Sequence, residues 1–333
     1  MKILPNIPGK TILITGIHGF LGVHTSIMAL KTGANVVGVD LPGSSTRGKK
    51  VRFSLGGEQI PFKEADLSNY EDWPDILKET KPDIILHLAG ATKRGLSGAD
   101  WFGNIHGNFL TTSAMIQAVI SLPEQERPVV VYPGSQMEYG TSSVPWTEET
   151  LCRPINPYGA SKLASTNIIL TAERAKMIRV CVARFSILYG PAQPPTMFIP
   201  ELISKVLAGV NFKMTEGRQK RRFLYVSDAA SLILNLGARL LKQETLPALI
   251  NMPASEPRSI REVAQQIVDC IDKPVAIEIG AISLRDNETI ESWPDDSLAK
   301  SLGLACKTTL EDGLKQTVQW YKDNPWFLKG SAL

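Results

Sequence analysis

A glycine-rich turn close to the N-terminus constrains the fold of this chain more than any other feature. The segment TGIHGFLG, residues 15–22, follows an apolar run at residues 11–15 and precedes a helical pattern at residues 23–30. The next apolar run, residues 35–39, ends at Asp40. Strand, glycine turn, helix, strand and acidic residue form, in this order, the dinucleotide-binding unit of parallel α/β folds. In that unit, backbone amides at the start of the helix hold the pyrophosphate.

The acidic residue that ends this unit predicts which dinucleotide is bound. The Asp40 carboxylate would accept hydrogen bonds from the adenosine ribose hydroxyls and would repel a 2′-phosphate. NAD is therefore the predicted cofactor. Arg47 follows closely enough in the sequence to contact a phosphate, so NADP stays open as the alternative.

Further apolar runs extend this unit into a larger sheet. Runs at residues 84–88, 129–132 and 179–185 alternate with helical stretches, as a doubly wound sheet requires. The first and last of these runs are almost continuously apolar, as expected where helices cover both faces of a sheet. The sequence therefore predicts an α/β chain with a doubly wound parallel (Rossmann) sheet. A proline-rich turn at residues 190–195 indicates that a smaller C-terminal region starts near residue 186.

A tyrosine and a lysine four residues apart give the strongest chemical signal. In the run NPYGASK, Tyr158 and Lys162 would lie one turn apart on the same face of a helix. The lysine ammonium would favour the tyrosine anion, because a nearby opposite charge stabilises an ionised group. Such a pair can move a proton to or from an alcohol or carbonyl oxygen. The spacing therefore predicts acid/base chemistry at a substrate oxygen.

The order of these motifs resembles one enzyme family. The glycine turn resembles the TGxxGFLG pattern of extended short-chain dehydrogenases/reductases, in the group of nucleotide-sugar epimerases, dehydratases and reductases. Four later segments resemble patterns of the same group: HLAG at 87–90, GSQMEYG at 134–140, RFSILYGP at 184–191 and GRQKRRFLYVSD at 217–228. The resemblance implies an NAD(P)-dependent enzyme that acts on carbon 4 of a nucleotide sugar.

The resemblance also implies catalytic roles for residues at matching positions. Tyr158 would be the acid/base, and Lys162 would hold the nicotinamide ribose and favour the tyrosinate. Ser135 would donate a hydrogen bond to the same substrate oxygen; a turn serine without such a role is the alternative. Asn104 resembles the helix asparagine that completes the family's active-site hydrogen bonds, with an ordinary surface-helix asparagine as the alternative.

Binding roles follow from the resemblance in the same way. Arg221 and Arg285 fall where arginines of the family contact the substrate pyrophosphate, a task that suits the paired donors of guanidinium. Arg221 belongs to a basic run, and a solvated surface is the alternative for such a run. The positions implied for the cofactor are Gly16, His18, Gly19, Phe20, Leu21, Gly22, Asp40, Asp66, Leu67, Leu88, Ala89, Gly90, Tyr158, Lys162 and Phe185.

Three reactions remain to be compared. Gln136 and Met137 stand where the family's 4,6-dehydratases carry Asp and Glu, so dehydration is disfavoured. The GSxxEYG loop resembles reductases, which favours a 4-ketoreductase of a nucleotide-linked 4-keto-6-deoxy sugar. A 4-epimerase with retained NAD is the alternative, with which Asp40 agrees. A sensor that binds the dinucleotide without catalysis is remote, because both Tyr158 and Lys162 are present.

The family's architecture implies two discontinuous domains. We expect the dinucleotide-binding domain at residues 1–185 plus about 222–250, and the nucleotide-sugar domain at about 186–221 plus 251–333. Helices near 100–120 and 158–175 form a dimer interface in the family, so a homodimer is expected.

Composition limits the cellular compartments and the binding partners that we expect for this protein. A formal net charge of +3 over 333 residues gives no reason to expect nucleic acid as a partner. No apolar run approaches the roughly 18 residues of a membrane helix, and the N-terminus lacks a signal-peptide core. The four cysteines are scattered and the four histidines show no metal-ligand spacing, so a cytoplasmic protein without a bound metal is predicted.

Overall fold

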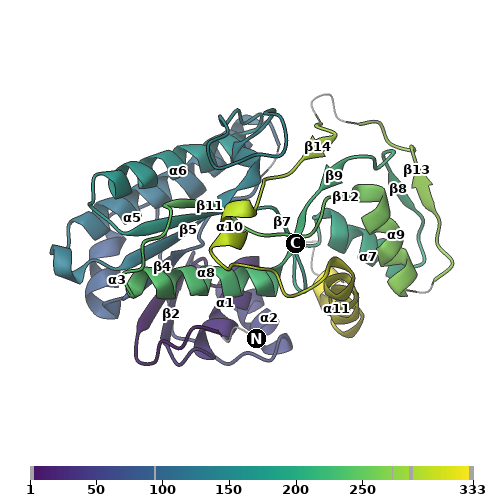
Figure 1. Ribbon diagram of the computed structural model, residues 1–333. Helices are drawn as coiled ribbons and strands as arrows, with labels where there is room; N and C mark the ends of the chain where they lie inside the picture. Colours follow the sequence, from purple (N-terminus) through teal and green to yellow (C-terminus); the bar gives the residue numbers. More distant parts are fainter. Residues whose placement is uncertain (1–3, 94, 272, 285–287, 330–333) are drawn as a thin grey trace. The chain divides into compact units, whose positions relative to one another are not determined.

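The computed structural model describes residues 4–93, 95–271, 273–284 and 288–329 (Figure 1). The chain divides into two compact units, each assembled from separate segments. The first unit comprises Met1–Ser142, Thr147–Phe185 and Ala229–Met252. The second unit comprises Ser143–Trp146, Ser186–Asp228 and Pro253–Leu333.

A seven-stranded parallel sheet forms the centre of the first unit. Its strand order is β11-β6-β5-β4-β1-β2-β3. The direction in which successive strands are added to the sheet reverses between β1 and β4. At such a reversal, α/β proteins bind ligands in the crevice beyond the carboxyl ends of the strands. The strands are β1 (Thr11–Thr15), β2 (Asn35–Asp40), β3 (Phe62–Glu64), β4 (Ile84–His87), β5 (Val129–Ser135), β6 (Val180–Phe185) and β11 (Leu249–Asn251).

Helices cover both faces of this sheet, which explains why its central strands are apolar throughout (Figure 1). Helices α1 (Phe20–Leu30) and α8 (Val226–Leu241) lie on one side. On the other side, α3 (Asp72–Thr80), α5 (Thr111–Ile120) and α6 (Pro157–Arg174) pack on the strands and bury Trp73, Met115 and Ile169 completely. The remaining helical segments are α2 (Ser45–Ser54), α4 (Gly98–Asn104), the π-helix η1 (Ile105–Leu110) and the 3₁₀ turns η2 (Glu124–Glu126) and η3 (Gln136–Glu138).

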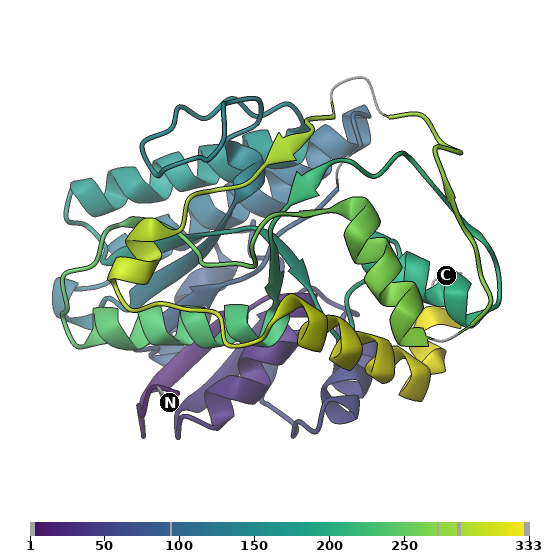
Figure 2. The same ribbon diagram turned by 45° about the vertical axis from the view of Figure 1, so that its right-hand side comes forward.

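The second unit is made of shorter elements around its own apolar core. Its strand pairs are β7 (Ile187–Tyr189) with β10 (Phe223–Tyr225), β8 (Phe212–Met214) with β13 (Ile277–Ile279), and β9 (Lys220–Arg221) with both β12 (Arg258–Ser259) and β14 (Glu291–Ser292). Its helices are α7 (Phe198–Leu207), α9 (Ile260–Ile271), α10 (Ser297–Ser301), α11 (Leu310–Asp323) and α12 (Pro325–Lys329). Figure 2 shows α9 and α11 side by side.

The fold class predicted from the sequence is confirmed: the chain contains a doubly wound parallel sheet. The predicted strands shift slightly at their ends, since β4 stops at His87 and β5 continues to Ser135. Two strands of this seven-stranded sheet were not predicted, Phe62–Glu64 and Leu249–Asn251. Each has three residues and depends on pairing with a neighbour rather than on a long apolar run.

Two further observations concern the described residues. None of their helices is both long and apolar enough to cross a lipid bilayer. The cysteines Cys152, Cys181, Cys270 and Cys306 are all free thiols.

Candidate active site

The glycine turn between β1 and α1 is packed so closely that two of its positions have no room for a side chain. Gly16 has φ of +65°, a conformation that side chains disfavour, and a Cβ there would lie 2.9 Å from Ala89 Cα. A Cβ on Gly22 would collide with the carbonyl oxygen of Gly16. Helix α1 starts at Phe20 with Gly19 as its N-cap, so its first backbone amides face the turn. This cradle fits a pyrophosphate, as the sequence predicted for a dinucleotide.

Asp40 lies at the end of β2 and joins it to the glycine turn. Its Oδ2 accepts a hydrogen bond from the backbone N–H of His18 at 2.7 Å, and its Oδ1 accepts one from Leu41 at 2.8 Å. A carboxylate has about four acceptor positions, so these bonds orient the group and leave capacity for ribose hydroxyls. Asp40 therefore shapes the turn, and its contact with the ribose stays a prediction.

The loops that follow β3 and β4 hold the other positions predicted for the cofactor. The backbone N–H of Ala89 donates to Thr15 Oγ1 at 3.0 Å, which fixes the loop after β4 beside the glycine turn. Asp66 Oδ1 accepts from the Ser68 hydroxyl at 2.7 Å, and the neighbouring Leu67 is buried. Gly90 is exposed at the end of its loop. Three loops of the first unit thus contribute predicted cofactor positions.

Helix α6 positions Tyr158 and Lys162. Its N-cap is Asn156, whose Oδ1 accepts from the Gly159 backbone N–H at 2.8 Å, and Pro157 follows as the first helical residue. The cap fixes the start of the helix, so Tyr158 and Lys162 lie in its first two turns. Tyr158 is half-buried.

Lys162 is buried against an aromatic ring. Its side-chain nitrogen lies 4.0 Å from the centroid of the Tyr132 ring, on strand β5. Burial lowers the pKa of Lys162 to about 7, and the Glu138 carboxylate opposes this shift. The ammonium is thus poised to lose its proton near neutral pH, in contrast to an exposed lysine.

Ser135 ends β5 and begins the turn η3. Its Oγ accepts from the Met137 backbone N–H at 3.2 Å, which leaves its own proton to donate elsewhere. The turn packs directly on α6, since a Cβ on Gly159 would collide with the carbonyl oxygen of Met137. The glycine beside Tyr158 therefore lets the loop of residues 134–140, which carries Ser135, approach the helix of Tyr158 and Lys162. On β6, Phe185 is buried and pairs in register with Ser135.

Asn104 is buried, and its amide is bound locally. Its Nδ2 donates to the carbonyl oxygens of Lys93 and Asp100, both at 2.8 Å. Asn108, one turn further along, makes the contact with α6: its Nδ2 donates to Ser161 Oγ at 2.9 Å. The role predicted for Asn104 stays a prediction, and Asn108 is a neighbour of the site that the sequence analysis missed.

The arginines predicted to bind substrate belong to the second unit. Arg221 donates to the carbonyl oxygens of Lys220, Thr289 and Ile290, at 2.8, 2.7 and 3.2 Å. Burial lowers its pKa. Arg285 lies outside the described residues. The adjacent Arg222 pairs with buried Asp296 at 3.1 Å, so part of this basic run stabilises the fold instead of facing water.

A group of buried side chains behind Lys162 and Ser135 was not predicted. Thr15 Oγ1 contacts His87 Nδ1 at 3.0 Å, and the His87 ring stacks on Tyr132 at 6.1 Å. Burial lowers the pKa of His87 to about 3, so its imidazole is neutral. Glu138 forms an ion pair with Arg184 in the same region. No pattern of neighbouring residues in the sequence predicts these contacts, because they join residues on different strands.

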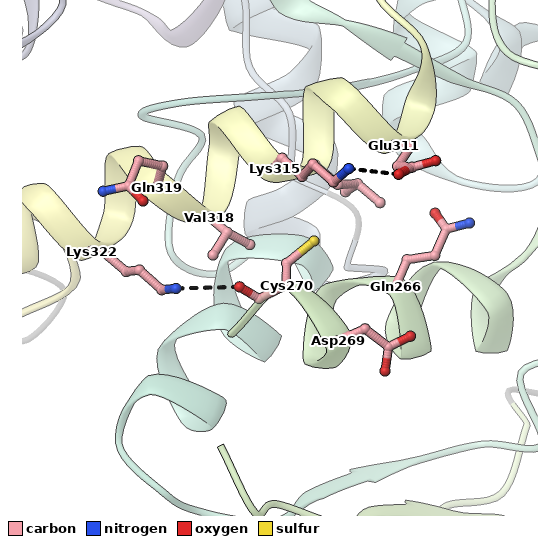
Figure 3. Close-up of a pocket in the computed structure, with 9 residues that line it drawn as sticks. Gln266, Asp269, Cys270, Glu311, Lys315, Val318, Gln319 and Lys322 are labelled. Atoms are coloured by element: carbon pink, nitrogen blue, oxygen red, sulfur yellow. Dashed lines mark hydrogen bonds and ion pairs between the residues drawn. The ribbon is translucent and has the colours of Figure 1, made fainter. Parts of the chain in front are cut away.

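A pocket in the second unit contains none of the predicted residues (Figure 3). It has a volume of about 570 Å³ and lies between α9 and α11. Its charged side chains have partners nearby: Lys315 pairs with Glu311 at 2.6 Å, and Lys322 donates to the Cys270 carbonyl at 3.3 Å. Within the described residues, no group of three or more His, Cys, Asp or Glu side chains could hold a metal ion.

A parallel sheet with a glycine cradle, a Tyr–Lys helix and a serine loop defines Rossmann-fold oxidoreductases of the short-chain dehydrogenase/reductase class. Comparison with known proteins identifies the family within this class. The family described as "NAD dependent epimerase/dehydratase family" matches residues 12–245, and the chain belongs to it. The protein is therefore a member of a family of NAD-dependent nucleotide-sugar enzymes, and NAD is its cofactor.

Relatives with different reactions share this fold. The dTDP-glucose 4,6-dehydratase of Xanthomonas campestris is 28% identical over 340 residues, covering 96% of this chain and 95% of the relative. The Bacillus anthracis dTDP-glucose 4,6-dehydratase, solved with NAD, has a TM-score of 0.82 at 23% identity over 96% of this chain and 99% of its own. The Bacillus cereus UDP-glucuronic acid 4-epimerase, solved with UDP-glucuronic acid and NAD, has a TM-score of 0.81 at 24% identity over 94% and 99%.

Replacing Asp40 tests which dinucleotide the site selects. Asp40→Asn keeps an acceptor for the His18 backbone but removes the charge that would repel a 2′-phosphate. We expect the ratio of NADP to NAD affinity to rise by about tenfold, corresponding to roughly 1.4 kcal/mol. Titration of both nucleotides by calorimetry measures this ratio. Asp40→Ala serves as the comparison, since it also removes the acceptor and should weaken NAD binding more than NADP binding. An unchanged preference in both variants would contradict the role of this carboxylate.

Proposed function

We propose that this protein reduces carbon 4 of a nucleotide-linked 4-keto-6-deoxy sugar with NAD(P)H. The observation that carries the proposal is the loop GSQMEYG at residues 134–140, called the serine loop below. It resembles the corresponding loop of 4-ketoreductases. It combines the predicted catalytic Ser135 with residues that do not support elimination of water.

The serine loop does not offer the acid and base that dehydration needs. Gln136 and Met137 occupy the positions where the family's 4,6-dehydratases carry Asp and Glu, and Met137 can neither give nor take a proton. Glu138 is 0% exposed, and both its oxygens are bound within the protein. Removal of water across carbons 5 and 6 requires proton transfers in addition to hydride transfer. These features favour oxidoreduction at carbon 4 alone.

The residues of α6 and the serine loop suit ketone reduction. The bound dinucleotide supplies the hydride. Tyr158 would give its hydroxyl proton to the carbon 4 oxygen, and the Lys162 ammonium would stabilise the resulting tyrosinate. Ser135, which accepts a backbone hydrogen bond, would donate its own proton in a hydrogen bond to the same oxygen.

Arg221 is proposed to meet the pyrophosphate of the nucleotide sugar. Its three hydrogen bonds to backbone carbonyls use three of the five N–H groups of a guanidinium and fix its direction. A fixed, permanently charged group binds a pyrophosphate with little loss of side-chain entropy. Arg285 is proposed as a second contact from the resemblance alone.

A 4-epimerase is the second candidate. Asp40 supports it, because an epimerase must retain NAD while hydride leaves carbon 4 and returns to the opposite face of the sugar. The same Tyr158 and Lys162 would then remove and return the proton. The two reactions differ in whether the dinucleotide leaves after each turnover.

The first experiment separates these candidates. Small molecules are released from freshly purified, denatured protein and identified by mass spectrometry. We expect a largely empty cofactor site, and turnover of 4-keto nucleotide sugars that depends on added NAD(P)H. Stoichiometric NAD together with a trace of nucleotide sugar, and turnover without added cofactor, would contradict the reductase and favour the epimerase.

We propose in addition that the protein is a homodimer. Helix α4 and the π-helix η1 expose several large apolar side chains close together in the sequence. Their members are Trp101, Phe102, Ile105 and Leu110, and Phe102 alone is 71% exposed. An exposed cluster of this kind is typical of a protein interface.

Replacing one member of this cluster tests the dimer. Phe102→Asp should convert the dimer into a monomer, because burying an unpaired carboxylate in an apolar interface is costly. Light scattering after size exclusion measures the mass. Phe53→Asp is the matched control, since Phe53 is also exposed but lies on α2. A wild-type monomer, or a Phe102→Asp variant that stays dimeric, would contradict the proposed interface.

A further inference from the structure

An ion pair is buried directly behind the serine loop. Glu138 Oε2 accepts from Arg184 Nε and Nη2, both at 2.8 Å. The side chain of Glu138 is 0% exposed and that of Arg184 is 4% exposed. Two charges removed from water this completely are costly unless each is fully hydrogen-bonded. Such a pair calls for an explanation beyond stability, because apolar residues of similar size would often stabilise the fold as well.

The second oxygen of Glu138 connects the pair to Ser135. Glu138 Oε1 accepts from the Ser135 backbone N–H at 2.7 Å, and Ser135 in turn caps the turn that carries Glu138. Every group that faces this carboxylate in these bonds is a donor. Glutamine, with one acceptor oxygen and one donor nitrogen, could satisfy only part of the set. The site therefore requires a carboxylate.

Neighbouring residues leave space for the Glu138–Arg184 ion pair and cover it. Gly134 lies opposite Arg184 in the β5–β6 register, and a Cβ there would be 2.8 Å from Arg184 Cγ and 3.0 Å from Glu138 Oε1. The guanidinium lies 4.5 Å from the centroid of the Tyr139 ring, whose hydroxyl donates to Asn251 Oδ1 at 2.7 Å. Glycine before Ser135 thus leaves room for the pair, and an aromatic ring covers it.

We propose that Glu138, held by Arg184, is a positioning residue of the active site: it fixes the backbone of Ser135 and places one buried carboxylate near Lys162 of α6. This inference rests on the proposed function for the roles of Ser135, Tyr158 and Lys162. Glu138 itself does not touch the substrate. It acts through the residues that do.

The charge of Glu138 matters most for Lys162. The groups that face this lysine are Tyr132 on β5, His87 on β4 and Glu138 on η3. His87 is neutral, and burial raises the pKa of Tyr132, so neither supplies a negative charge. Glu138 opposes the effect of burial on the pKa of Lys162. It thereby helps the ammonium to keep the proton that stabilises a tyrosinate.

Two measurements on Glu138→Gln test the proposal. The first is the titration of Lys162, followed by NMR of protein labelled with ¹³C at the lysine ε-carbon and assigned by loss of the signal in Lys162→Arg. We expect the apparent pKa of Lys162 to fall by about one unit. The second is steady-state kinetics, in which kcat should fall about 10- to 100-fold with KM and NAD affinity unchanged, because a small misplacement of a catalytic group can cost about 10²-fold in rate. Glu138→Asp, which keeps the charge, should recover part of both effects.

Companion variants separate positioning from folding. Glu138→Gln leaves Arg184 without its anion and can destabilise the protein, so the double variant Glu138→Gln/Arg184→Gln removes both charges and lets the two amides pair. It should stay folded by circular dichroism and still show the lowered kcat, because Ser135 loses the carboxylate that holds its backbone. The pKa of Lys162 should move less than in Glu138→Gln, because the Arg184 cation is removed as well. Asp296→Asn breaks the buried pair with Arg222 in the second unit and is the matched control. It should lower the melting temperature without moving the Lys162 titration.

The outcomes are distinct. A Lys162 titration and a kcat that are both unchanged in folded Glu138 variants would overturn the proposal and reduce the pair to a structural feature. A shift of equal size in Asp296→Asn would also overturn it. Because the titration needs no substrate, a lowered Lys162 pKa stands even if the protein proves not to be a 4-ketoreductase.

Discussion

We expect Tyr158→Phe to abolish most turnover while NAD binding is preserved. The change removes one hydroxyl from a half-buried side chain at the start of α6 and keeps its ring. Without the hydroxyl, the substrate oxygen has no proton donor or acceptor at this position. General acid/base groups contribute about 10²–10⁴ to a rate, so kcat should fall by about that factor. Lys162, which is predicted to hold the nicotinamide ribose, and the glycine turn are untouched, so NAD affinity should change little.

Turnover and NAD affinity are measured on the same protein, by following NAD(P)H absorbance and by calorimetry. Tyr70→Phe is the matched control: it removes a tyrosine hydroxyl from a half-buried side chain of the first unit that has no predicted role, and should keep full activity. Near-normal activity in Tyr158→Phe would refute the mechanism. Loss of NAD binding would instead show that the hydroxyl belongs to the cofactor site.

Gly22→Ala should remove NAD binding by closing the glycine cradle. The added methyl group would collide with the Gly16 carbonyl oxygen, and Gly16 is itself restricted by Ala89. Either α1 moves away from the turn or the turn changes shape, and both displace the amides that face the pyrophosphate. Overpacking of this kind costs about 1–3 kcal/mol of folding stability. We expect NAD affinity to fall by at least about tenfold, since each 1.4 kcal/mol lost in binding gives that factor.

Calorimetric titration of NAD and thermal unfolding without NAD measure the two effects of this variant. Gly98→Ala is the control, because Gly98 is the first residue of α4 and an added Cβ there meets open space. The control should be neutral or stabilising by about 0.4–1 kcal/mol, since alanine restricts the unfolded chain. If Gly22→Ala binds NAD normally, the close contact between helix and turn does not shape the cofactor site.

The fold could be predicted from the sequence where local patterns are long. β1, β2, β4, β5 and β6 are apolar runs separated by helical stretches, and the glycine turn fixes the position of the first helix. The three-residue strands β3 and β11 could not be predicted in this way. They are held in place by pairing with neighbouring strands rather than by the β-propensity of their own residues. The π-helix η1 could not be predicted either, because its wider turn does not produce a recognisable spacing of apolar residues.

The residues of the candidate site also fall into two groups, those that could be predicted from the sequence and those that could not. Tyr158 and Lys162 could be predicted because their spacing is local, one turn of a helix. The hydrogen bond from Asn108 to Ser161 joins residues 53 apart, and that from Arg184 to Glu138 joins residues 46 apart. Only the packed fold brings these residues together. A buried glutamate in the sequence looks like any other charged residue until its partner is known.

The position of β11 at the edge of the sheet affects how the chain can be synthesised. β11 is the outer neighbour of β6, yet it reaches the sheet only after the chain has passed through residues 186–228 of the second unit. A nascent or truncated chain that ends at Phe185 contains Ser135, Tyr158 and Lys162, but its β6 has an open edge. An unpaired strand edge recruits strands of other chains and promotes aggregation. The first unit is therefore completed only after about 250 residues have been synthesised, because β11 follows the segment 186–228 of the second unit in the chain.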